Sequence, residues 1–304
     1  MKHIFIVNPA AGGGKAESKF LPMIIDACKE ANVEYEIHRS LNKNDIISWV
    51  RQRAMTNKPC RFYACGGDGT VNDVMSGLVG YDKAELAIIP CGTGNDFVKN
   101  WTNNKKNLLI QELMNGKVIP VDVIQYKDSF AINMINIGAD CDVVVEAKNL
   151  QNLHGAAAYL VGALKVLPKG PVYRMRYSID DEPEVEGDFL LMCIANGVYC
   201  GGGFKSCPIA SVHDKLIDVC LVKPVGGPKI VPLMLKYRAG KHLTDPELQD
   251  LIIYRQCRSF KLTALKPVNL SKDGEVEEFD QAEFKIYPNS VNLVIPQSSE
   301  LISK

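Results

Sequence analysis

Three glycine-rich stretches in the first hundred residues carry groups suited to phosphate chemistry. They are Asn8-Pro9-Ala10-Ala11-Gly12-Gly13-Gly14-Lys15, Gly66-Gly67-Asp68-Gly69-Thr70-Val71-Asn72 and Gly92-Thr93-Gly94-Asn95-Asp96-Phe97. Glycines after a buried strand let backbone amides approach a ligand, and a following helix points its positive end into the same space. A carboxylate there would repel phosphate, so Asp68 is better suited to orient a metal ion or its waters. Taken alone, the second stretch is equally well explained as a strand-to-helix turn with an incidental aspartate.

The segments around these stretches alternate between strand and helix patterns. Apolar runs predict strands at 3–7, 34–39, 61–65 and 85–90, and periodic segments predict helices at 16–31, 44–56 and 72–79. This alternation is typical of a parallel sheet covered by helices. Ligands of such sheets bind beyond the carboxyl ends of the strands. The three glycine stretches and Ser40 should therefore line one crevice.

The pattern changes near residue 118, where strand-like runs become frequent. They lie at 118–126, 130–138, 173–179, 187–196, 216–222, 251–265, 277–287 and 291–295, with helical patterns at 140–149 and 154–167. Clustered strands separated by turn residues predict an antiparallel sandwich or barrel. We therefore expect an α/β domain at 1–120 and a β-rich domain at 121–289, with the option that about 290–304 packs back on the first.

Composition and missing motifs exclude several classes of protein. The chain has 304 residues and a formal net charge of zero, which argues against a general nucleic-acid binder. No apolar run approaches the ~20 residues that span a bilayer, so any membrane contact is expected to be peripheral. Ten dispersed cysteines without a C-x-x-C pair fit a reducing cytosol. Neither a P-loop nor a G-x-S-x-G elbow is present.

Together the three glycine stretches resemble the signature blocks of the diacylglycerol kinase catalytic-domain family, in its bacterial soluble lipid kinase branch, which is related to sphingosine and ceramide kinases. The resemblance implies an NAD-kinase-like, three-layer parallel-sheet domain, a C-terminal antiparallel β-sandwich, and an active site in the cleft between them. It also implies ATP and Mg²⁺ as cofactors. The implied nucleotide-site residues are Asn8, Pro9, Gly12, Gly13, Ser40, Gly66, Gly67, Asp68, Gly69, Thr70, Asn72, Thr93, Asn95 and Asp96. For Asn95 and Asp96, a helix N-cap pair is an equal alternative.

Two motifs in the second half extend the resemblance. The 211–219 segment is similar to a family block in which one aspartate and two backbone carbonyls hold magnesium, which implies Ser211, Asp214 and Leu216 as ligands. His213 and Lys215 depart from the pattern: the lysine adds a positive charge, and its backbone is not expected to reach the φ > 0 conformation open to glycine. An ordinary turn before a strand is the alternative.

The Asp273-Gly274-Glu275 segment matches the family motif that supplies the catalytic carboxylate. By itself an Asp-Gly pair between two such runs indicates a β-hairpin turn, which is compatible with catalysis. The resemblance favours Asp273 as general base, with Glu275 next; in an extended segment both would share a face. Asp68 completes the catalytic set.

The resulting hypothesis is phosphoryl transfer from ATP to a lipid hydroxyl, with diacylglycerol giving phosphatidic acid as the first expectation. An NAD kinase, whose family shares the Gly-Gly-Asp-Gly-Thr block, is one alternative, and a non-catalytic nucleotide sensor is another. The expected partners are ATP and a lipid at the membrane surface, not nucleic acid. The expected location is the cytoplasm with peripheral membrane association. The oligomeric state stays open, with a homodimer among the alternatives.

Overall fold

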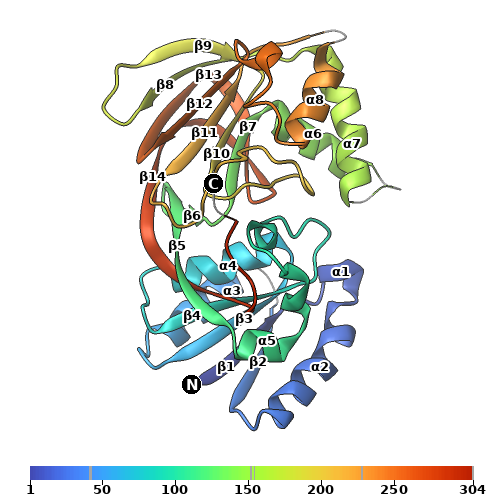
Figure 1. The fold of residues 1–304 in the computed structure, drawn as a ribbon, viewed down its shortest axis with the longest axis vertical. Helices are drawn as coiled ribbons and strands as arrows, with labels where there is room; N and C mark the ends of the chain where they lie inside the picture. Colours follow the sequence, from blue (N-terminus) through green and yellow to red (C-terminus); the bar gives the residue numbers. More distant parts are fainter. Residues whose placement is uncertain (41–42, 151–152, 154, 227–228, 303–304) are drawn as a thin grey trace. The chain divides into compact units, whose positions relative to one another are not determined.

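The protein divides into two compact units in a computed structural model that describes residues 1–40, 43–150, 153, 155–226 and 229–302. The first unit comprises Met1–Val123 and Pro288–Ser303, and the second comprises Ile124–Tyr287. The chain leaves the first unit inside strand β5 (Lys117–Tyr126) and returns inside strand β14 (Glu275–Ile295). Figure 1 shows the elements of each unit.

A parallel sheet forms the middle of the first unit. Its strand order is β14-β4-β3-β1-β2, with β1 at Lys2–Val7, β2 at Tyr35–Arg39, β3 at Cys60–Gly66 and β4 at Ala84–Pro90. The four strands predicted from sequence are thus confirmed. The end of β14 extends the sheet, because Leu293 pairs in parallel with Leu86 of β4.

Helices cover both faces of this sheet, which gives the predicted three layers. On one face, α2 (Ala16–Glu30) and α5 (Ile110–Met114) share a hydrophobic core with every second residue of β1, such as Phe5 and Val7. α4 (Asp68–Leu78) packs on β3 and β4, and α3 (Lys43–Ala54) packs on α4. The latter contact is close, since a Cβ on Gly77 would lie 2.8 Å from the Val50 Cβ.

The second unit is built of antiparallel strands, as predicted. One path runs β12-β11-β10-β7-β13, and β13 also pairs with β14 and β8. The strands are β6 (Ser129–Ala131), β7 (Met134–Gly138), β8 (Tyr173–Ile179), β9 (Val185–Phe189), β10 (Leu191–Ala195), β11 (Ile217–Val222), β12 (Ile252–Cys257) and β13 (Ser259–Lys272). An irregularity between Thr263 and Val268 lets the two halves of β13 pair with different strands, β8 and β7.

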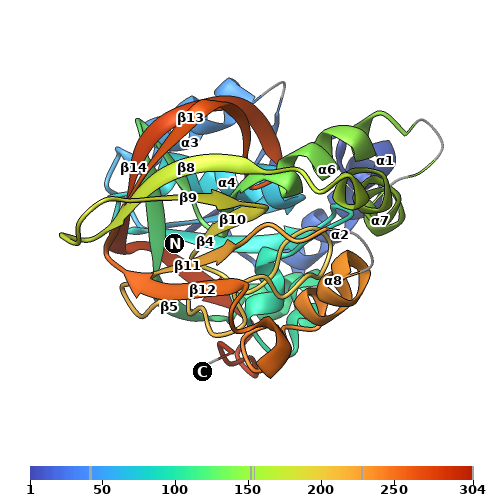
Figure 2. The same cartoon turned by 90° about the horizontal axis from the view of Figure 1, so that it is seen from above.

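Both faces of strands β10 and β11 are buried, and their residues are apolar except for Asp218 of β11. Met192 and Ile194 belong to the core between the strands, while Cys193 and Ala195 belong to a second core under helices. Those helices are α6 (Ala139–Lys148), α7 (Gly155–Val166) and α8 (Ile230–Arg238). Figure 2 shows them gathered on one side of the unit's strands.

Several element boundaries differ from the sequence predictions. The 130–138, 187–196 and 251–265 runs each contain two strands, and the 277–287 and 291–295 runs are one strand, β14. Helix α8 was not predicted, because Pro232 interrupts its pattern. Within the described residues, no helix combines the length and apolarity needed to span a membrane.

Candidate active site

The Gly66-Gly67-Asp68 turn joins β3 directly to α4. Gly67 is the extended N-cap residue (φ −92°, ψ −171°), and the helix begins at Asp68 rather than at Asn72 as predicted from sequence. The predicted loop is therefore largely the first turn and a half of a helix. An acidic side chain in the first turn is favourable beside the positive end of the helix dipole, which explains the early start. Thr70 and Asn72 are buried within this helix.

The glycines of this turn are required by packing. A Cβ on Gly66 would lie 2.3 Å from the Thr70 Oγ1, and a Cβ on Gly92 would lie 2.5 Å from the Gly67 Cα. The Cys91 amide also donates to the Gly66 carbonyl over 2.8 Å. By contrast, a Cβ on Gly69 would meet nothing within 4 Å. The loops after β3 and β4 thus pack backbone against backbone, while the start of α4 stays open at Gly69.

The loop after β1 reaches the same helix. The Asn8 side-chain amide donates to the Thr70 Oγ1 over 2.9 Å, and the Asn8 Oδ1 accepts from the Ala10 amide across the neighbouring Pro9. Gly12 and Gly13 follow with left-handed φ values of 62° and 67°, inside the short turn labelled α1 (Ala11–Gly14). A Cβ on Gly12 would lie 3.2 Å from the Cys91 carbonyl oxygen.

Ser40 directly follows β2, and its amide donates to the Val7 carbonyl at the end of β1 over 3.0 Å. The residues predicted from sequence to share the carboxyl edge of the sheet are therefore brought together within the first unit. Among them Thr93 is exposed.

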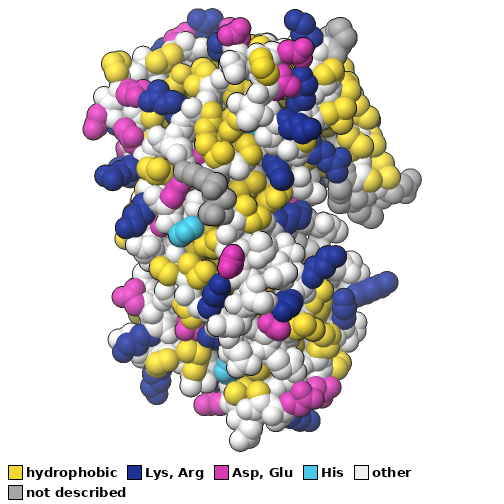
Figure 3. All heavy atoms as spheres, in the orientation of Figure 1, with side chains coloured by type: hydrophobic (Ala, Val, Ile, Leu, Met, Phe, Trp, Pro, Cys, Tyr) yellow, Lys and Arg dark blue, Asp and Glu magenta, His cyan; other side chains and the backbone are white. Residues whose placement is uncertain are grey.

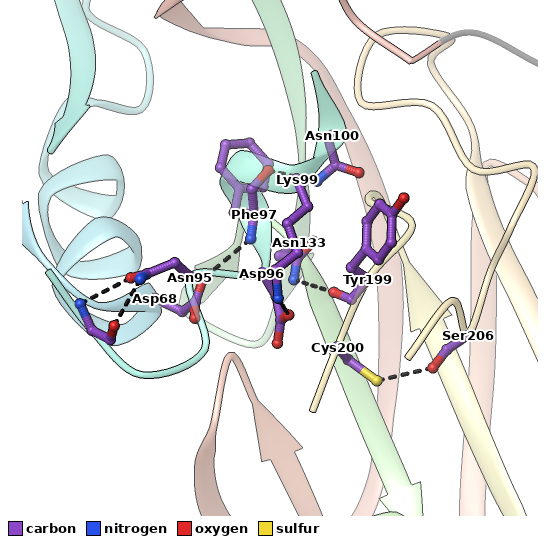
Figure 4. A network of polar contacts seen from close by, with 11 residues as sticks. Asp68, Asn95, Asp96, Phe97, Lys99, Asn100, Asn133, Tyr199, Cys200 and Ser206 are labelled. Carbon is purple, nitrogen blue, oxygen red and sulfur yellow. Dashed lines mark hydrogen bonds and ion pairs between the residues drawn. The ribbon is translucent and has the colours of Figure 1, made fainter. Parts of the chain in front are cut away.

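Asp68 lies near the Asp96–Lys99 ion pair within the first unit (Figure 4). Its Oδ1 accepts a hydrogen bond from the Phe97 amide over 3.1 Å. Asp96, which is buried, forms an ion pair with Lys99. Burial raises the pKa of Asp68, and the negative charge of Asp96 raises it further, against the opposing effect of hydrogen bonds and Lys99.

Asn95 and Asp96 do not act as a side-chain N-cap pair. Asn95, at φ 47°, closes its own turn by accepting from the Gly92 amide over 2.9 Å and donating to the Gly92 carbonyl over 2.7 Å. Asp96 is the N-cap residue of the short 3-10 helix η1 (Phe97–Asn100) but makes no side-chain capping hydrogen bond. The capping alternative raised by the sequence is thus wrong for Asn95, while Asp96 holds the N-cap position without a capping hydrogen bond from its side chain.

In the second unit, Asp273 and Gly274 form the predicted β-hairpin turn between β13 and β14. Their φ values are 46° and 93°, and Lys272 pairs with Glu275 across the turn. The Asp273 carboxylate is fixed from both sides, since Oδ1 accepts from the Met134 amide over 3.0 Å and Oδ2 accepts from the Ile132 amide over 3.3 Å.

Asp273 and Glu275 do not lie in one extended segment, so they do not share one face as the sequence would have allowed. That arrangement needs an extended segment, whereas Asp273 is left-handed and only Glu275 belongs to β14. Glu275 is exposed, whereas Asp273 is half-buried. The structure therefore distinguishes the two candidates for the general base: two backbone amides orient the Asp273 carboxylate, whereas Glu275 is exposed.

The predicted magnesium segment is a turn before β11. Lys215 adopts φ 66°, so the expectation that lysine would not reach the glycine conformation is wrong. The Asp214 Oδ1 accepts from the Leu216 amide over 3.1 Å, and the Ser211 hydroxyl lies 3.0 Å from the His213 Nδ1. In the described part of the chain, no three His, Cys, Asp or Glu side chains cluster as metal ligands. A site made of one carboxylate and two carbonyls would not form such a cluster.

An apolar pocket lies under α7 and α8 in the second unit, where an apolar substrate pocket is expected from the sequence. It holds about 470 Å³ of space, including the part open to solvent, and its lining includes Tyr159, Leu167, Leu233 and Tyr237. Asp140 is the one carboxylate in this lining. Its side chain is hydrogen-bonded by the Tyr159 hydroxyl, and among the described residues its Oδ2 has no partner. Burial raises the pKa of Asp140. In the sequence it resembles any acidic residue at a helix start.

Comparison with known proteins covers both units. Residues 2–126 match the diacylglycerol kinase catalytic domain, and residues 133–295 match the YegS C-terminal NAD kinase beta sandwich-like domain. A probable lipid kinase YegS-like protein of Alcanivorax borkumensis is 28% identical over 300 residues, covering 95% of this chain and 96% of that protein. A diacylglycerol kinase of Bacillus subtilis is 24% identical and covers 98% and 97%.

Solved structures show the same fold. A diacylglycerol kinase from Bacillus anthracis superposes with a TM-score of 0.68 at 21% identity, covering 96% of each chain. An NAD kinase from Archaeoglobus fulgidus, solved in complex with ATP, gives a TM-score of 0.51 at 12% identity and covers 98% of this chain and 94% of that one. The predicted NAD-kinase-like fold is therefore confirmed. With both of its units matched, the chain belongs to the family of YegS-like lipid kinases that carry the diacylglycerol kinase catalytic domain.

Proposed function

We propose that the protein transfers the γ-phosphoryl group of ATP to a lipid hydroxyl, with diacylglycerol as the acceptor and phosphatidic acid as the product. The observation that carries this is the position of Asp68 in the first turn of α4, bonded to the Phe97 amide in the neighbouring glycine loop. In a member of this kinase family, that arrangement suits a carboxylate that orients magnesium or its waters beside a bound nucleotide.

The first domain, 1–120 with the C-terminal segment at about 290–304, would bind the nucleotide. The phosphates would lie against the backbone amides at the start of α4, where space is open at Gly69. A helix N-terminus favours negative charge through its free amides and its dipole. The loops at Asn8, Ser40 and Thr93 surround this position and would hold the rest of the nucleotide.

Magnesium would neutralise the developing charge on the transferred phosphoryl group. Asp68 would orient this ion or its waters. The second predicted site, the carbonyls of Ser211 and Leu216 with the Asp214 carboxylate, offers hard oxygen ligands of the kind Mg²⁺ accepts. The left-handed Lys215 gives the turn the backbone conformation that glycine would give, so the residues fit this cation.

Asp273 would accept the proton of the attacking hydroxyl. Two backbone amides hold its carboxylate in one orientation, as positioning of a general base requires. Because phosphoryl transfer proceeds through a loose transition state, the proton leaves late and an ordinary carboxylate suffices.

The second domain, 121–289, would bind the lipid. Its apolar pocket offers a place for an acyl chain, with the Asp140 carboxylate in the lining. A lipid acceptor implies a cytoplasmic protein that associates peripherally with the membrane surface.

The decisive experiment incubates the protein with radiolabelled ATP, Mg²⁺ and a total lipid extract, and then identifies the labelled product. Labelled phosphatidic acid is expected, and Asp68→Ala should abolish it while the fold is retained. NAD is offered in parallel, and labelled NADP without labelled lipid would contradict the proposal. Tight ATP binding without transfer to any acceptor would indicate a nucleotide sensor instead.

A further inference from the structure

Helices α7 and α8 each expose a pair of large apolar side chains to solvent. Leu160 and Leu164 of α7 are 36% and 50% exposed, and Val231 and Leu235 of α8 are 43% and 58% exposed. Residues four apart lie on one helix face, so each pair forms a short outward stripe. Figures 1 and 2 place α8 beside α7, and Figure 3 shows hydrophobic side chains gathered over them.

The two chain segments that carry these stripes contain charges of one sign only. The 155–172 and 223–241 segments contain no aspartate or glutamate, although the whole chain balances 35 acidic against 35 basic residues. Their basic residues are Lys165, Lys169, Lys223, Lys229, Lys236, Arg238 and Lys241. Lys165 pairs with Glu146, and Lys236 pairs with Asp245 and Glu247. Exposed cations such as Lys169 and Lys229 border both helices.

The inner faces of the same helices line the apolar pocket. Tyr159 and Ala163 of α7 and Leu233 and Tyr237 of α8 contribute to its lining. The two helices are thus apolar inward and outward, with cations at their ends. Helices that lie in a membrane interface combine exposed apolar side chains with lysines in this way.

We propose that this α7–α8 face, defined by Leu160, Leu164, Val231 and Leu235 with Lys169 and Lys229, docks on an anionic lipid bilayer. The inference rests on the proposed function, because a lipid substrate gives a bilayer-contacting face its use. The apolar side chains enter the interface and the lysines contact anionic headgroups. Since the chain has no net charge, attraction to such a surface has to come from a local patch.

The test is vesicle co-sedimentation without ATP, with phosphatidylcholine vesicles alone or mixed with phosphatidylglycerol. The wild-type protein is expected to bind the mixed vesicles at least about tenfold more strongly than the neutral ones. L164E/L235E should reduce binding to both, and K169E/K229E should remove the preference for the anionic vesicles. Val185→Glu is the matched control, because Val185 is a large apolar residue of the same unit whose 49% exposure is close to the 50% of Leu164, but it lies in β9.

A second readout, tryptophan fluorescence, detects contact with the vesicles in variants that still bind them. Leu164→Trp should give a blue-shifted emission component with mixed vesicles, and Val185→Trp should not. If L164E/L235E binds like the wild type, or if Val185→Trp shifts as strongly as Leu164→Trp, the proposal is wrong. If the wild type is a dimer that L164E/L235E splits, a second copy covers this face and the proposal also fails.

Failure of the docking proposal is distinguishable from failure of the proposed function. One outcome is transfer to lipid in detergent micelles together with vesicle binding that the α7–α8 substitutions do not change. It would support the proposed kinase function and contradict the docking proposal. Vesicle binding that depends on the α7–α8 face, without transfer to any lipid, would support the docking proposal and contradict the proposed kinase function.

Discussion

At the scale of single residues, Asp273 is the sharpest test of the proposed chemistry. Asp273→Asn removes the proton acceptor but keeps a residue that tolerates the φ of 46°. Turnover is expected to fall by about 10²–10⁴, as for loss of a general base. One of the two amide hydrogen bonds is lost as well, which costs about 1–2 kcal/mol of stability. Steady-state kinetics and urea unfolding measure the two effects separately.

Glu275→Gln is the matched control, because Glu275 is exposed and lies beyond the turn. Its turnover should stay within about tenfold of the wild type, a smaller loss than the ~10²–10⁴ expected on removal of a general base. The assignment of the base would be reversed if Glu275→Gln were inactive while Asp273→Asn kept near wild-type turnover.

Asp96 tunes the ionisation of Asp68. Because burial and Asp96 both raise the pKa of Asp68, its charged fraction declines at a higher pH than that of an ordinary aspartate. If catalysis needs the carboxylate, activity falls as pH decreases through this raised pKa. Asp96→Asn removes one negative charge, so the acidic limb of kcat/KM should move to lower pH. The pH profile between 4 and 8 measures this, whatever the loss in maximal rate. A limb that stays in place or moves to higher pH would contradict the role given to Asp68.

At the scale of elements, the glycine loops should be sensitive to a single methyl group. Gly92→Ala forces a Cβ to 2.5 Å from the Gly67 Cα, so the two backbones have to separate. A loss of about 1–3 kcal/mol is expected, typical of overpacking. Gly69→Ala meets open space at the start of α4 and should stabilise slightly. Thermal unfolding of both variants is the measurement, and equal melting temperatures would contradict the packing argument.

Periodicity predicted the parallel layer and the antiparallel strands because hydrophobic alternation is a local property. The start of α4 at Asp68 could not be read in this way, since glycines that signal a loop are here needed for contact with Thr70 and Gly92. The contact with Gly92 joins loops that follow two different strands, β3 and β4. Asp140 went unnoticed for the same reason, because only packing places its carboxylate in an apolar pocket. Helix α8 was hidden by Pro232, which is tolerated because it lies in the first helical turn, where the N–H groups have no intrahelical partner.

At the scale of the whole molecule, two buried histidines should set the response to acid. Burial lowers the pKa of His3 in the first unit and of His242 in the second to about 4. His3 contacts the Tyr63 hydroxyl over 2.8 Å, and the His242 Nε2 lies 3.2 Å from the Ser206 carbonyl oxygen. Neither environment offers a carboxylate that would stabilise the protonated ring in these contacts.

Protonation of the unfolded chain therefore opposes folding in mild acid. Below its ordinary pKa of 6.5 the unfolded histidine binds a proton, while the folded one stays neutral until about 4. Stability is thus full above pH 6.5 and declines as pH falls to 4, by up to about 3 kcal/mol for each histidine. The raised pKa values of Asp68 and Asp140 act in the opposite direction, because they favour the folded state as pH falls. His242→Gln keeps a donor for the Ser206 carbonyl but cannot titrate.

The measurement is the free energy of urea unfolding at pH 7, 6 and 5 for the wild type and His242→Gln. Both tryptophans, Trp49 and Trp101, lie in the first unit, so their fluorescence reports that unit, while hydrogen exchange at β10 and β11 reports the second. The variant should lose less stability in the second unit between pH 7 and 5 than the wild type does. The first unit, governed by His3, should respond to acid equally in both proteins. An unchanged pH slope at β10 and β11 would show that His242 is not the group that destabilises this unit in acid.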